Sequence, residues 1–141
     1  MLKLGRNERL RETVVLPTGK LLDVNTDVES NIKPIIAAQA ATIKALQEWQ
    51  KTPNDEHLQR GFYLAYEGFL TALLGAANYK AALEAYNGDV GEMCAQFDSW
   101  VAAKAYPVIE RASHNIMERR KKEAGKLERK FRRRARRAGN A

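Results

Sequence analysis

Two short apolar runs near the start of the chain lie on either side of a turn signal. Residues 12–16 (ETVVL) and 20–24 (KLLDV) are rich in β-branched and large apolar side chains. Between these runs, Pro17 presets φ and Gly19 allows a positive φ. The pattern predicts a short β-hairpin. We expect this hairpin to pack on other elements, because an isolated hairpin is only marginally stable in water.

From Asp27 onward the apolar residues recur every three or four positions, which predicts helices. A first helix is expected from about Pro34, which suits a first turn, to about Lys51. A second helix is expected between Thr52 as its N-cap, with Pro53 in the first position, and Gly75 as its C-cap. The predicted inner faces consist of Ile35, Ile36, Ala40, Ile43, Leu46 and Trp49 in the first helix, and of Leu58, Phe62, Ala65, Tyr66, Phe69 and Leu73 in the second.

The helices expected after Gly75 are separated by clear stop and start signals. A helix at residues 78–86 should end at Asn87-Gly88, where a left-handed turn fits. Asp89 should cap the next helix, and Pro107 should kink the chain or restart it as a last helix. The predicted inner faces consist of Val90, Met93, Cys94, Phe97, Trp100 and Val101, and then of Val108, Ile109, Ala112 and Ile116.

Charge divides the chain into two parts. Residues 118–137 hold twelve Lys or Arg against three Glu, a local net charge of +9, which leaves −2 for the rest of a chain whose total is +7. We therefore expect a helical body with an N-terminal hairpin at residues 1–117 and a basic arm at residues 118–141. The predicted fold is mainly α: a short N-terminal β-hairpin, a body of four to five helices and a basic C-terminal helical arm.

The basic arm is the candidate binding site for an anionic partner. It can neutralise phosphates, dock an acidic protein, lie on anionic lipid or remain a solvated tail. If it is helical, Ala124, Leu127, Phe131 and Ala135 form one weak apolar stripe. The candidate residues are Arg119, Arg120, Lys121, Lys122, Arg132, Arg133, Arg134, Arg136 and Arg137.

The sequence offers no constellation for catalysis. His57 and His114 stand in polar surroundings, and Cys94 stands on an apolar face, which is typical of an inert buried thiol. The chain shows no paired metal-ligand spacing and no glycine-rich phosphate-binding loop. We expect no enzyme activity, no cofactor and no metal.

Length and composition indicate one domain whose apolar runs are too short to span a bilayer. A single cysteine excludes an internal disulfide, and the first residues lack the features of a secretory signal. We therefore expect a cytoplasmic protein, in the host cell if it is encoded by a phage.

The order of these features resembles the small tail assembly chaperones of long-tailed bacteriophages. The first shared feature is a β-segment at residues 13–24 (TVVLPTGKLLDV). The second lies at residues 69–89 (FLTALLGAANYKAALEAYNGD), where an apolar helix ends in a Leu-Gly step and a short helix follows before an Asn/Gly-Asp turn. A last helix with a proline and Ile-Glu, here residues 107–110 (PVIE), also fits. The resemblance covers residues 13–112, and the Arg-rich arm departs from the family pattern.

The resemblance implies a chaperone that coats the helical tape-measure protein and helps to recruit tail-tube subunits. A small body with an exposed apolar groove between helices could chaperone in this way, and we expect the protein to bind these components and to self-associate as a homo-oligomer. The alternatives are a nucleic-acid-associated protein that grips phosphates with its basic arm, and a structural virion component such as a connector or scaffold.

Overall fold

In the computed structural model, which describes residues 7–139, the chain opens with an antiparallel hairpin of strands β1 (Arg9–Val15) and β2 (Leu21–Asp27). Val15 pairs with Leu21 beside the turn, where Gly19 has a φ of +86°. The predicted hairpin is confirmed, and both strands extend beyond the predicted runs. Polar contacts fasten β2 to the helices: the Thr26 hydroxyl donates to the Leu73 carbonyl, and the Asn78 amide donates to the Asp23 carbonyl.

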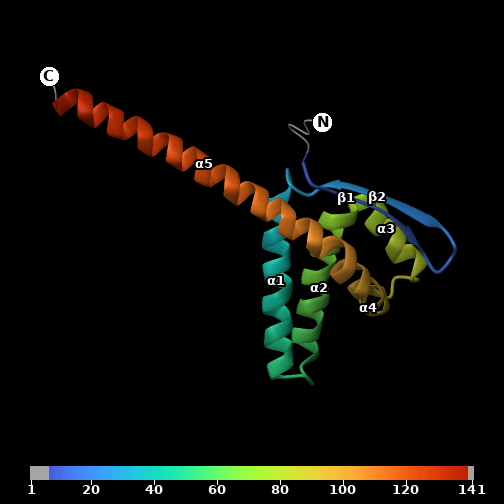
Figure 1. The fold of residues 1–141 in the computed structure, drawn as a ribbon. Coiled ribbons are helices and arrows are strands. Elements are labelled where there is room, and N and C mark those ends of the chain that lie inside the picture. Colours follow the sequence, from blue (N-terminus) through green and yellow to red (C-terminus); the bar gives the residue numbers. More distant parts are fainter. Residues whose placement is uncertain (1–6, 140–141) are drawn as a thin grey trace.

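The rest of the described chain is helical, as predicted (Figure 1). Helices α1 and α2 form an antiparallel pair, α3 lies beneath β2 of the hairpin, and α4 packs against α2 and α3. The last helix starts inside the body, crosses the end of the α1–α2 pair and projects far beyond it. The helices are α1 (Ile32–Lys51), α2 (Glu56–Leu74), α3 (Ala76–Ala85), α4 (Val90–Trp100) and α5 (Tyr106–Gly139), with a π-helical turn η1 (Val101–Ala105) between the last two.

The helix ends follow most of the signals in the sequence. Gly75 separates α2 from α3 at a φ of +89°, and Asn87 and Gly88 both adopt a positive φ after α3. Asp89 caps α4, because its carboxylate accepts from the backbone N–H of Glu92. The expectation for α2 is wrong: Asp55, not Thr52, is the N-cap, and its carboxylate accepts from the backbone N–H groups of His57 and Leu58.

The predicted interruption at Pro107 takes the form of a π-helical turn at Val101–Ala105, and the chain stays helical without a gap from Val90 to Gly139. The Tyr106 N–H donates to the Val101 carbonyl, five residues back rather than four. Because a proline has no N–H to donate and crowds the preceding turn, the widened turn lets the chain continue into α5.

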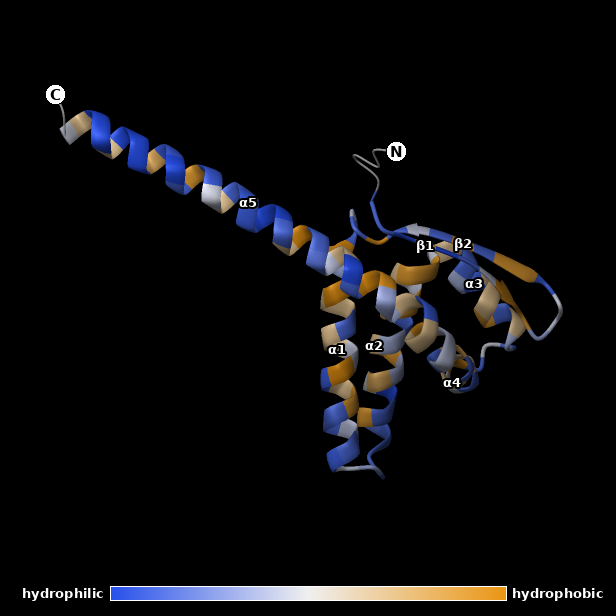
Figure 2. Cartoon of the chain, viewed as in Figure 1, coloured by the Kyte–Doolittle hydropathy of each residue, from blue (hydrophilic) through white to orange (hydrophobic). Residues whose placement is uncertain are grey.

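The hydrophobic core lies between the inner face of the hairpin and the helices (Figure 2). Tyr66 and Phe69 of α2 pack edge to face, with ring centroids 6.3 Å apart. Every element contributes at least one buried side chain. The core includes Leu10, Leu22, Val24, Ile35, Phe69, Leu70, Leu73, Ala82, Met93, Phe97, Val101, Ala105, Val108, Ile109 and Ala112.

The predicted inner face of α1 is partly wrong. Ile35 is buried and Trp49 is half-buried, but Ile36, Ala40 and Ile43 are exposed. Thr42 is buried in place of Ile43, and its hydroxyl donates to the Ala38 carbonyl within the helix. As a result, α1 presents the apolar side chains of Ile36, Ala40 and Ile43 to solvent.

Candidate partner-binding surface

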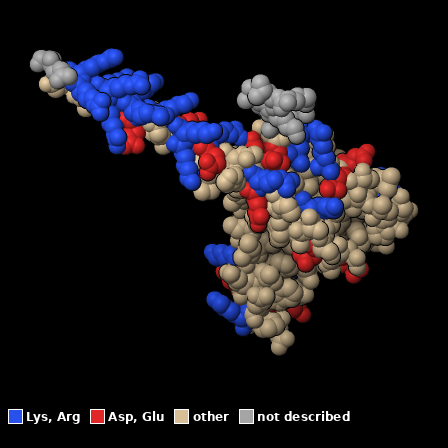
Figure 3. Space-filling view, viewed as in Figure 1, with Lys and Arg blue, Asp and Glu red and all other residues tan. Residues whose placement is uncertain are grey.

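The predicted basic arm is the outer half of α5. Residues 140 and 141 lie outside the described residues, and residues 118–139 continue the helix without a break. From Arg119 to Gly139 every residue except Gly125 is exposed. Figure 3 shows Lys and Arg side chains along the whole projecting rod, whereas both signs of charge are mixed on the body.

The nine predicted site residues all lie on α5, but they differ in their contacts. Arg119 forms an ion pair with Glu29 of the body, and Arg120 lines a groove beside α1. Two further cations are paired within the helix, Lys121 with Glu118 and Arg132 with Glu128. In the part of the chain that the structure describes, the remaining five make no ion pair: Lys122, Arg133, Arg134, Arg136 and Arg137.

A polar clamp, formed by Glu8 and Glu29 with Arg111, Asn115 and Arg119, fastens α5 to the body. The Arg111 guanidinium lies 3.3 Å from the Glu8 carboxylate, and the Asn115 amide donates to the Glu29 carboxylate over 3.0 Å. Arg119 donates to the other oxygen of Glu29, whose side chain is only 4% exposed. These three α5 residues are spaced four apart on one side of the helix, so the clamp fixes the direction in which the arm leaves the body.

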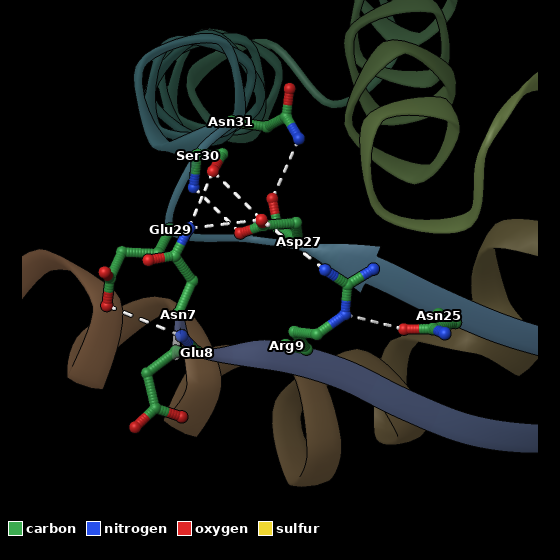
Figure 4. A network of polar contacts seen from close by, with 8 residues as sticks. All are labelled: Asn7, Glu8, Arg9, Asn25, Asp27, Glu29, Ser30 and Asn31. Atoms are coloured by element: carbon green, nitrogen blue, oxygen red, sulfur yellow. Dashed lines mark hydrogen bonds and ion pairs between the residues drawn. The ribbon is translucent and has the colours of Figure 1, made fainter. Parts of the chain in front are cut away.

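The connection between β2 and α1, which carries Glu29, is itself ordered by Asp27 (Figure 4). The Asp27 carboxylate accepts from the backbone N–H and the hydroxyl of Ser30 and from the Asn7 amide. The Arg9 guanidinium lies 3.5 Å away. The backbone N–H of Ser30 is the main reason that the pKa of Asp27 lies below its usual value.

An apolar groove of about 370 Å³ runs between the start of α1 and the middle of α5. The side chains of Ile36 and Met117, which are 41% and 56% exposed, border it. Its lining consists of Ile32, Lys33, Ile36 and Ala37 from α1, and of Ser113, Ile116, Met117 and Arg120 from α5. The only charged groups in the lining are the cations Lys33 and Arg120.

The structure does not bring the residues considered for catalysis together. His57 is exposed at the start of α2, and His114 is exposed on α5, the helix that crosses the other end of the α1–α2 pair (Figure 1). Cys94 is buried, and its burial, with the nearby charge of Glu67, raises the pKa of the thiol to about 12. Within residues 7–139, no three His, Cys, Asp or Glu side chains are grouped so that they can hold a metal ion.

Sequence reasoning pointed to the arm but missed the clamp and the place of the groove. Arg111, Asn115 and Arg119 share a spacing of four, which was the available signal for the clamp, but nothing local to Glu29 identifies it as their partner. None of the helices in residues 7–139 is both long and apolar enough to cross a bilayer.

Comparison of the chain with protein-family models, with curated proteins and with solved structures finds no match.

Proposed function

We propose that this protein is a non-enzymatic assembly chaperone of a phage tail, which binds the tape-measure protein and tail-tube subunits while the tail is built. The observation that carries the proposal is the groove between α1 and α5, which leaves Ile36 and Met117 partly exposed. A groove between two helices, lined by aliphatic side chains, is a common receptor for the apolar face of an amphipathic helix.

The client class follows from the same physics. A tape-measure protein is a long helical chain with apolar stripes, which aggregate unless partner helices cover them. The groove supplies one such cover, and the exposed stripe of Ile36, Ala40 and Ile43 extends it along α1.

Co-expression with candidate tail components tests the proposal. The full chain carrying an affinity tag is purified together with an untagged tape-measure fragment or tail-tube protein. A matched variant, Ile36→Asp, places a carboxylate at the edge of the groove, and we expect it to retain less than a tenth of the captured client. Capture of neither component by the unchanged protein contradicts the proposal.

Nucleic-acid binding is the second candidate, and nine cations of the arm that make no ion pair within residues 7–139 favour it. Each phosphate contact that is lost reduces the dependence of log affinity on log salt by about 0.9. If the arm grips phosphate, we expect Lys126→Gln, Arg129→Gln and Arg133→Gln together to reduce this slope by about 3 for duplex DNA. In a chaperone that binds clients through apolar contacts, the same triple variant still captures its client.

A further inference from the structure

We infer that the face of α5 from Ser113 to Phe131 is a docking seam for an acidic amphipathic helix of a partner protein. The inference rests on the proposed function, because it names the chemistry of the client segment. It depends on three properties of α5: the position of its apolar residues around the helix, its unbalanced charge, and the continuity of both with the groove beside α1.

The apolar residues of the arm lie in line with the groove. Counted at about 100° per residue, the α5 residues that line the groove and the apolar residues further out fall within an arc of about 100°. Met117 and Phe131 are only about 40° apart on this arc, although they are separated by almost four turns. The docking seam consists of Ser113, Ile116, Met117, Arg120, Ala124, Leu127 and Phe131.

Leu127 and Phe131 mark the seam as a protein-binding surface. Their side chains are 55% and 64% exposed on a helix that projects into solvent, where each has no role in the core. Phosphate binding by the arm leaves both in water, whereas a helix laid along the seam covers them. Arg120 suits the same partner, because its aliphatic stem can lie on the apolar surface while its guanidinium meets a carboxylate.

The charge of the arm selects an acidic occupant. Several cations stand four residues apart, and like charges at this spacing destabilise a helix. A second copy of this arm placed on the seam sets one local charge of +9 against another, and this repulsion disfavours self-association through the seam. An acidic helix on the seam lowers the net charge around the arm, and it lies nearest to one of these pairs, Lys130 with Arg134. The other like-charged pairs lie further around the helix: Lys122 with Lys126, Lys126 with Lys130, Arg129 with Arg133, Arg132 with Arg136, and Arg133 with Arg137.

The dimensions of the seam set the length of the occupant. From Ser113 to Phe131 the helix rises about 27 Å, at about 1.5 Å per residue. The matching partner is therefore a helix of about 18 residues with apolar side chains every three or four positions and Asp or Glu beside them. One end of this helix enters the groove, where Ile36 of α1 forms the opposite wall.

A designed peptide tests the seam without knowledge of the natural client. The probe is a fluorescently labelled 21-residue peptide of three heptads, with leucine at the first and fourth positions and glutamate beside them. A control peptide has the same composition with its leucines spread around the helix, and a labelled 21-base-pair DNA duplex serves as the third probe. Binding of each to the full-length protein is measured by fluorescence anisotropy at physiological salt.

Two double variants separate apolar docking from charge. Leu127→Ser with Phe131→Ser changes the seam and keeps every charge, whereas Arg129→Gln with Arg133→Gln removes two cations on the opposite face of α5. We expect the seam variant to bind the patterned peptide at least tenfold more weakly and the DNA equally. The opposite-face variant should bind the peptide at most threefold more weakly. All four positions are exposed, so both variants should retain the helix content and melting temperature of the unchanged protein.

Any one of three results with these probes overturns the inference. In the first, the seam variant binds the patterned peptide as tightly as the unchanged protein does. In the second, the control peptide binds as tightly as the patterned one. In the third, light scattering shows that the unchanged protein is a dimer and that the seam variant is a monomer. Failure of the proposed function is distinguishable from these. If the seam binds the peptide but no tail component is captured, the docking seam is supported and the tail-chaperone function is contradicted. If a tail component is captured equally by the seam variant, the chaperone stands and the seam falls.

Discussion

The two halves of α5 are one continuous helix held in place by different forces. The inner half buries Val108, Ile109 and Ala112 in the core, and the polar clamp fastens it through Arg119. The outer half projects into solvent, where it has only its own composition of Ala, Leu, Glu, Lys and Arg to favour the helical state. Tertiary packing maintains the inner half, and local propensity maintains the outer half.

The difference between the halves also separates stability from recognition. Side chains that stabilise the body are already engaged, as Glu29 is with Asn115 and Arg119. The outer half keeps Leu127, Phe131 and most of its cations available to a partner. Substitutions in the inner half of α5 should therefore destabilise the fold, whereas the outer half can bind a partner without losing contacts to the body.

Truncating an aliphatic side chain in each half should give the largest contrast. Ile109 is buried and Leu127 is exposed, and both stand on the same helix. We expect Ile109→Ala to reduce the free energy of unfolding by about 2–5 kcal/mol, because it removes buried surface and leaves a cavity. Leu127→Ala should change it by less than about 0.5 kcal/mol. Urea unfolding followed by circular dichroism measures both, and equal losses contradict the division of α5 into two halves.

Removing one arginine from each half should give the next largest contrast. Arg119→Gln deprives the buried Glu29 carboxylate of its cationic partner, and we expect a loss of about 1–3 kcal/mol in the free energy of unfolding. The matched control, Arg129→Gln, removes the same charge from the exposed half and should cost less than about 0.5 kcal/mol. If both variants unfold at the same urea concentration, the clamp contributes nothing to stability.

Features that depend on a few neighbouring residues could be predicted from the sequence. The hairpin turn, the end of α2 at Gly75, the left-handed Asn87-Gly88 step and the cap at Asp89 are all local, and all are confirmed. The cap of α2 is the exception. Thr52 and Asp55 are both good capping residues, and Asp55 prevails because its carboxylate accepts two backbone N–H groups.

Features that depend on distant segments could not be predicted. Apolar residues surround most of α1, so periodicity alone did not decide whether Ile35 or Ile36 faces the core. The position of α2 and α5 decides it, and the apolar side that they leave uncovered becomes part of the groove. Glu29 likewise belongs to the clamp only because α5 passes beside it. The basic arm itself was visible in the sequence, because charge needs no tertiary context.

Gly125 allows the outer half to be stabilised without touching the body. It lies in mid-helix, and a Cβ added there meets nothing within 4 Å. We expect Gly125→Ala to favour the helical state of the arm by about 1 kcal/mol, which is roughly a fivefold slower amide hydrogen exchange in residues 120–139. Exchange in the inner half and the midpoint of global unfolding should stay unchanged. A shift of that midpoint contradicts the energetic independence of the two halves.

Acid should destabilise the connection between β2 and α1, which carries Glu29 of the polar clamp, through protonation of Asp27. The pKa of Asp27 is lowered in the fold, so its carboxylate contributes stability above its unfolded pKa of 3.8, and this contribution is lost as the pH falls through the folded pKa. We expect Asp27→Asn to cost at most about 1 kcal/mol at pH 7, because the side chain is partly exposed. The two proteins should converge below pH 3.8. Urea unfolding at pH 7, 5 and 3 measures the difference, and a gap that widens in acid shows that the charge of Asp27 does not stabilise the connection that carries Glu29.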